Sequence, residues 1–242
     1  MTYPTSWENA KRLRKALLLF LTLALGLLVL TLLDKHLWNL LLLDPDKSLE
    51  RKDWWQVLRQ IGSIFPWLIV AALLILLDRS RAHSFTNPYS APTLRKSAWH
   101  RGLMVLLATA ISGGLAEGLK GLVRRARPLE TGEYRFAWIE PGIHLPGGLA
   151  SSHTAVAFAG AIMLSWFIPV WRVPLILLAL CCSMTRVIVG AHFVTDVYIG
   201  ILLAWGTCAV LWKFFCKNPG GSNHPTASWM HLRDAERNTS QR

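Results

Sequence analysis

The sequence predicts an all-α protein, an integral membrane bundle of six transmembrane helices. Of its 242 residues, 52% are hydrophobic and only 17% are charged, whereas soluble domains carry about 25% charged residues. Its 12 tryptophans point the same way, because Trp prefers the interface between lipid and water. Six apolar runs approach the ~20 residues that a spanning helix needs, and they cover residues 16–33, 61–77, 102–122, 154–171, 173–190 and 197–212.

The first apolar run is expected to remain in the protein as a transmembrane helix. Basic residues precede it and Asp34 follows it, without the small-residue cleavage site of a signal peptide. Since basic residues mark the cytoplasmic side, we expect the N-terminus inside. Between the first two runs, Trp54 and Trp55 indicate a short helix lying in the membrane interface.

The net charge of +12 is concentrated in short clusters between the apolar runs. This pattern fits the positive-inside rule and attraction to anionic lipid headgroups, and it argues against nucleic-acid binding. Residues 120–152 fall outside in this topology although they are basic, which indicates that their charges have another role. We expect a cytoplasmic segment over 1–15, a six-helix domain over 16–215 and a mobile cytoplasmic tail over 216–242.

One cluster of polar residues joins the last two apolar runs on the outer side. Arg186 lies near the end of a span, where a charge is costly unless it faces a polar cavity. His192 and Asp196 are four residues apart, a spacing that puts them on one face if the segment is helical. The carboxylate would then orient the imidazole and leave its other nitrogen free as a nucleophile. The alternative is a structural His–Asp pair.

A second cluster opens the fourth apolar run. Ser151 and Ser152 are favoured N-cap residues, and a helix N-terminus attracts phosphate. His153 follows them in the first turn, where it could protonate a leaving oxygen. The alternative is an ordinary helix cap beside a structural histidine.

The remaining cluster, at the end of the third run, supplies positive charge. Lys120 and Arg127 could neutralise phosphate oxygens, Lys as a point charge and Arg bidentately, unless they are only a basic flank of the membrane helix. Together the three clusters suit phosphoryl transfer, which needs positioning and charge stabilisation. No group of acidic residues for Mg²⁺ accompanies them, so we expect a site that uses no metal and no other cofactor.

The three clusters resemble the motifs of the type 2 phosphatidic acid phosphatase superfamily, in its bacterial membrane lipid phosphatase branch. These motifs are Lys-x6-Arg-Pro, Pro-Ser-Gly-His and Ser-Arg-x5-His-x3-Asp, and the resemblance covers roughly residues 102–212. Three positions depart from them, since Ala150 replaces Pro, Ser152 replaces Gly and Thr185 replaces Ser. The matching residues are Lys120, Arg127 and Pro128 in the first motif, Ser151 and His153 in the second, and Arg186, His192 and Asp196 in the third.

The resemblance implies a metal-independent phosphatase that works through a phosphohistidine. It implies that His192 is the nucleophile, Asp196 its partner and His153 the acid. The phosphoryl oxygens would be bound by Lys120, Arg127, Ser151 and Arg186. We add Ser152 to the phosphate-binding residues because it belongs to the same helix N-terminus, although the family has Gly at its position.

The resemblance also implies a lipid substrate and a bacterial inner membrane, and the predicted topology puts the site at the outer face of that membrane. Relatives act on undecaprenyl pyrophosphate, phosphatidylglycerol phosphate, phosphatidate or the phosphates of lipid A. Two alternatives stay open: a phosphotransferase that passes the phosphoryl group between lipids, and a non-catalytic six-span transporter or lipid-binding scaffold. We expect headgroup choice to depend on residues 34–60 and 130–148.

Overall fold

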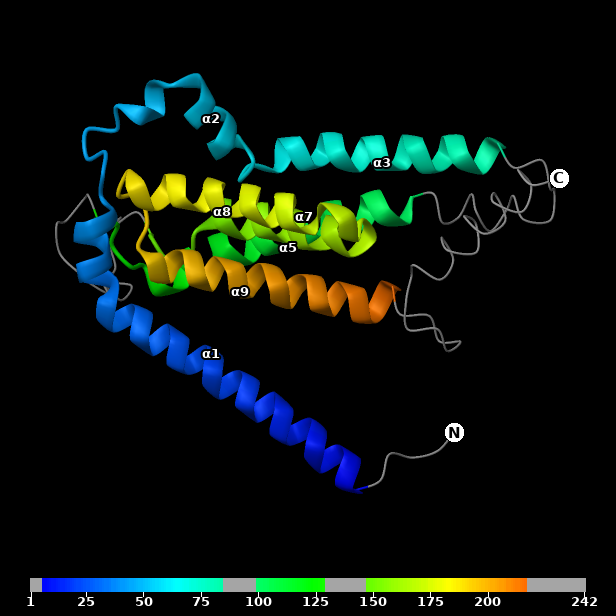
Figure 1. Cartoon of the computed structure of the whole chain (residues 1–242), viewed down its shortest axis with the longest axis horizontal. Coiled ribbons are helices and arrows are strands. Elements are labelled where there is room, and N and C mark those ends of the chain that lie inside the picture. Colours follow the sequence, from blue (N-terminus) through cyan, green and yellow to red (C-terminus); the bar gives the residue numbers. More distant parts are fainter. Residues whose placement is uncertain (1–5, 85–98, 129–146, 217–242) are drawn as a thin grey trace.

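The computed structural model describes residues 6–84, 99–128 and 147–216, and the regular elements of these residues are helices (Figure 1). The predicted all-α class is therefore confirmed for this part of the chain. The expected tail beyond residue 216 and most of the 130–148 segment lie outside it. In chain order, the helices are α1 (Ser6–Leu41), the 3-10 helix η1 (Leu49–Arg51), α2 (Asp53–Gln60), α3 (Ile64–Ser84), α5 (His100–Val123), α7 (Ser152–Phe167), the 3-10 helix η2 (Pro169–Trp171), α8 (Arg172–Ile188), α9 (Val194–Leu211) and the π-helical turn η3 (Trp212–Cys216).

The helices identify an integral membrane protein. Helix α7, with 16 residues, is apolar but shorter than a usual span. Helices α2 and α3 qualify as a span only together, and they are bent by 64° at the break between them. The described residues thus hold four or five candidate spans, and the count of six stays a prediction. The four uninterrupted candidates are Leu13–Leu41, His100–Val123, Pro169–Ile188 and Val194–Phe215.

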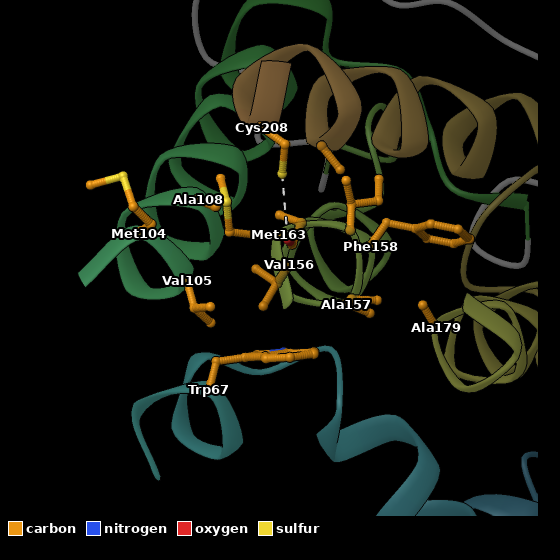
Figure 2. Close-up of a cluster of buried hydrophobic side chains, with 14 of the residues drawn as sticks. Trp67, Met104, Val105, Ala108, Val156, Ala157, Phe158, Met163, Ala179 and Cys208 are labelled. Atoms are coloured by element: carbon orange, nitrogen blue, oxygen red, sulfur yellow. Dashed lines mark hydrogen bonds between the residues drawn. The ribbon is translucent and has the colours of Figure 1, made fainter. Parts of the chain in front are cut away.

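Helix α7 forms the centre of the bundle and packs against α5, α8 and α9 (Figure 1). Its many alanines and Gly160 let neighbouring helices approach closely, as small residues do in membrane proteins. The indole of Trp67 in α3 lies against this face (Figure 2), and a Cβ added to Gly160 would come within 2.4 Å of it. On the opposite side, the Cys208 thiol of α9 donates to the Ala159 carbonyl at 3.4 Å.

The long helices alternate in direction, and this alternation brings all three polar clusters to one end of the bundle (Figure 1). Helices α5 and α8 end there, and α7 and α9 begin there. Helix α2 covers the same end, because Trp55 is buried against Val189 and Ala191 in the turn between α8 and α9. The predicted short helix around Trp54 and Trp55 is therefore present.

Helix α1 stands apart from the bundle except along its C-terminal half (Figure 1). The contact begins near the middle of α1, where Tyr198 of α9 donates its hydroxyl to the Leu23 carbonyl at 3.1 Å. The helix is also longer than the predicted run of residues 16–33, since it extends from Ser6 to Leu41. It continues past Asp34 because this carboxylate is not exposed to lipid but buried among polar partners.

Candidate active site

A pocket of about 790 Å³ opens at the end of the bundle where the polar clusters meet. Six of the eight predicted site residues line it. The other two, Ser151 and Asp196, are fully buried beside it. The lining residues are Glu117, Lys120, Gly121, Arg124, Arg127, Gly147, Ser152, His153, Arg186 and His192.

The last turn of α5 and the chain after it bring three cations to the pocket. Lys120 lies in that turn, and its Nζ donates to Glu117 Oε1 at 2.7 Å and to Ser152 Oγ at 2.9 Å. Arg124 caps the helix in a left-handed conformation with φ of 41°, so the chain reverses direction there. As a result Arg124 and Arg127 both reach the pocket.

The N-terminus of α7 supplies the second part of the site. Ser151 is the N-cap, as predicted, and its hydroxyl accepts from the Thr154 amide at 3.5 Å. Its own amide donates to the Asp196 carbonyl at 3.1 Å, which ties α7 to α9. Ser152 and His153 occupy the first turn and line the pocket. The uncapped amides of such a turn favour an anion.

Arg186 reaches the pocket from the last turn of α8. Its Nη1 lies 3.4 Å from Glu50 Oε1, and Arg59 Nη1 lies 3.7 Å from the same oxygen. Glu50 and Arg59 belong to the 34–60 segment that was expected to contribute to headgroup choice. The carboxylate of Glu50 holds two arginines at the edge of the pocket, which offsets the cost of a buried guanidinium.

The prediction that His192 and Asp196 share a helix face is wrong. His192 lies in the turn before α9, and Asp196 is in the first turn of that helix. Gly190, with φ of 68°, turns the chain so that the amide of His192 donates to the Arg186 carbonyl at 3.2 Å. The two side chains still meet, because the turn directs the imidazole back toward the carboxylate.

His192 Nδ1 lies 3.5 Å from Asp196 Oδ2, a separation longer than an ordinary hydrogen bond. Catalytic hydrogen bonds are often long in enzymes without substrate and shorten when it binds. Burial lowers the pKa of His192, and the nearby Asp196 carboxylate opposes that shift. The burial therefore favours the neutral imidazole, the form in which a ring nitrogen is free to act as a nucleophile.

Behind the histidine lies a buried ionic cluster that the sequence motifs did not reveal. Arg125 Nη1 donates to Asp196 Oδ1 at 2.9 Å, and its Nη2 donates to Asp34 Oδ2 at 2.8 Å. Thr195 joins both groups, since its hydroxyl accepts from Arg125 and donates to Asp34. The available signals were an aspartate directly after the first apolar run and a third arginine in the basic cluster.

Known proteins with similar sequences include two bacterial lipid A 1-phosphatases. That of Rhizobium johnstonii is 28% identical over 142 residues, which cover 57% of this chain and 58% of the relative. That of Rhizobium etli is 25% identical over 159 residues, which cover 61% and 68%. The chain thus spans less than two thirds of the length of the first of these relatives.

A solved structure and a family profile extend the comparison. The transmembrane PAP2 type phosphatidylglycerolphosphate phosphatase of Bacillus subtilis aligns with a TM-score of 0.49 and 19% identity, over 80% of this chain and 96% of that one. The profile of the PAP2 superfamily matches residues 101–219, a region that contains all three motifs and the helices that form the pocket. Over residues 101–219, the chain belongs to the PAP2 superfamily.

Proposed function

We propose that the protein is a metal-independent phosphatase of lipid phosphates or pyrophosphates that acts through a phosphohistidine. One observation carries the proposal: cations and two histidines from three separate helix ends converge on one pocket. The cations Lys120, Arg127 and Arg186 would offset the charge of a phosphoryl group, a task that a metal ion performs in other phosphatases. The two histidines would then carry out the transfer.

In the first step, Nε2 of His192 attacks phosphorus. The new N–P bond forms as the P–O bond to the leaving group breaks, and His153 donates a proton to the departing oxygen. The imidazole becomes positively charged, and Asp196 at Nδ1 stabilises that charge. Ser151 and Ser152 begin the helix whose N-terminus would hold the phosphoryl oxygens.

In the second step, water takes the place of the leaving group. His153, now neutral, accepts a proton from that water as its oxygen attacks phosphorus. The N–P bond breaks, inorganic phosphate leaves and His192 returns to its neutral form. One residue therefore serves as acid in the first step and as base in the second.

For the substrate, we favour the phosphates of a glycolipid of the lipid A class. The support is the similarity to two lipid A 1-phosphatases. The helix ends that line the pocket also lie at one end of the bundle (Figure 1), where a headgroup could enter while its acyl chains stay in the bilayer. We further propose six spans, with α3 and α7 completing the set, in a bacterial inner membrane with the pocket outside.

The proposal is tested by phosphate release from purified lipids in detergent micelles. The panel comprises lipid A, undecaprenyl pyrophosphate, phosphatidylglycerol phosphate and phosphatidate, each assayed with and without EDTA. We expect release from at least one lipid, unchanged by EDTA, and a loss of about 10³-fold or more in a His192→Ala variant that still purifies as a folded protein. Wild-type turnover in that variant would disprove the nucleophile assignment.

A further inference from the structure

Arg125 is the most deeply buried cation among the described residues, with only 1% of its side chain exposed. It lies between two carboxylates that are 0% exposed, Asp34 of α1 and Asp196 of α9. A buried guanidinium is stable only when its charge is matched and its N–H groups are bonded. The two terminal nitrogens of Arg125 each donate to one of these carboxylates, Nη1 to Asp196 and Nη2 to Asp34.

The same guanidinium also fixes the turn that carries His192. Its Cζ lies 4.1 Å from the centre of the Phe193 ring, a distance typical of a cation–π contact. Its Nη1 donates to the Thr195 hydroxyl at 2.6 Å. Arg125 therefore touches three residues that follow His192 in the chain, namely Phe193, Thr195 and Asp196, without reaching the pocket itself.

The charges of the cluster favour a cationic His192. Two carboxylates and one guanidinium leave one negative charge in a buried environment. When phosphorylation makes the imidazole ring of His192 positively charged, the charges of the two carboxylates, the guanidinium and the ring sum to zero. Without Asp34, Arg125 would neutralise Asp196 alone, and no negative charge would remain for the imidazolium.

Hydrogen bonds to both oxygens of the Asp34 carboxylate fix it beside Arg125, where it can share the positive charge of the guanidinium. Its Oδ1 accepts from the Thr195 amide at 3.1 Å, and its Oδ2 accepts from Arg125 and from the Thr195 hydroxyl. These bonds join the C-terminal part of α1 to the first turn of α9. They hold Asp34 at Nη2 of Arg125 while Asp196 accepts from Nη1, so that the guanidinium is shared between two acceptors.

We propose that Asp34 and Arg125 are positioning residues that keep Asp196 in place and negatively charged for His192. The inference rests on the proposed function, because it assigns the charge that the phosphohistidine step requires. It makes the first transmembrane helix, outside the matched family region of residues 101–219, a part of the catalytic apparatus.

The central test is steady-state kinetics of Asp34→Asn. The substitution keeps the shape of the side chain and removes its charge. We expect kcat to fall about 10- to 100-fold, as when a group that orients a catalytic residue is lost, while KM changes less than about threefold. KM should hold because the phosphate-binding cations Lys120, Arg127 and Arg186 are untouched. A KM that rises with unchanged kcat would overturn the proposal.

The matched control is Asp78→Asn. Asp78 is also a buried carboxylate, and it is paired with Arg101 where α3 and α5 meet at the other end of the bundle. Its loss removes a buried ion pair without touching the pocket. Rates are expressed per folded enzyme, counted by monodisperse elution and by binding of orthovanadate. We expect kcat of Asp78→Asn to stay within about twofold of wild type.

A second variant separates charge from mere packing. In Asp34→Asn with Arg125→Gln, Asp196 regains an unshared charge, so kcat per folded enzyme should rise at least fivefold above that of Asp34→Asn alone. A double variant no faster than the single one would overturn the charge assignment. If the wild-type protein releases no phosphate from any lipid, the proposed function fails. If wild type is active and Asp34→Asn equals it, only this inference fails.

Discussion

His153 packs directly against the backbone of Gly62, in the bend between α2 and α3. A Cβ added to Gly62 would lie 2.6 Å from the Cβ of His153 and 2.9 Å from its Cα, closer than such atoms approach. Because one of these atoms belongs to the backbone of α7, the histidine or the whole bend must move. The position of His153, the proposed general acid, thus depends on a residue without a side chain.

We therefore expect Gly62→Ala to lower kcat about 10-fold or more, since small displacements of a catalytic group have large effects on rate. Gly114→Ala is the matched control, because a Cβ there meets no atom within 4 Å. Phosphate release measured under saturating lipid should separate the two variants. Equal rates for both would show that His153 is not held by this contact.

For single residues, the sequence predicted the candidate catalytic residues better than the residues that support them. Motif spacing identified His192, Asp196 and Lys120, and the structure places them around one pocket. Arg125 was not identified, since its partner Asp34 is 91 positions away and no local pattern joins them. The turn around Gly190 was also missed, so the His192–Asp196 pair was assigned to a helix that begins only at Val194.

At the scale of single elements, α7 and α3 depend on one close contact. Gly160 of α7 faces the ring of Trp67, and a Cβ there would meet three of its ring atoms at 2.4 Å. Gly160→Ala should lower the free energy of unfolding by about 1–3 kcal/mol, as overpacking does in a close-packed core.

Thermal unfolding in detergent measures this effect, with Gly206→Ala in α9 as the control because a Cβ there meets nothing within 4 Å. An Ala at position 160 that leaves the melting temperature unchanged would contradict the packing described here.

The helices themselves were largely predictable, because uncharged apolar runs form helices in a membrane. The predicted runs 102–122 and 173–190 differ from α5 (His100–Val123) and α8 (Arg172–Ile188) by two residues or fewer at each end. Helix ends that carry polar groups were not predictable from apolarity. Helix α1 runs on to Leu41 because Asp34 finds buried partners.

For the whole molecule, the helix ends that line the pocket and the turn between α7 and α8 lie at opposite ends of the bundle (Figure 1). The predicted topology puts the pocket outside. A cysteine at exposed Lys52, near the pocket, should then react with a membrane-impermeant maleimide in intact cells. A cysteine at Val170, which is 82% exposed at the other end, should react only after permeabilisation.

The unsubstituted chain, with its native cysteines, gives the background for this labelling. Reaction of Val170→Cys but not Lys52→Cys in intact cells would place the pocket inside and reverse the predicted orientation.

The anchoring of α1 through Asp34 has a consequence for biosynthesis. The partners of Asp34 follow it by 91 residues, at Arg125, and by 161 residues, at Thr195. At about 5–20 residues per second, the ribosome delivers the second of them roughly 8 to 32 s after Asp34. Until then the carboxylate has to stay hydrated at the membrane surface, because lipid would not tolerate it. The buried site around Asp34 is therefore complete only after α9 has been synthesised.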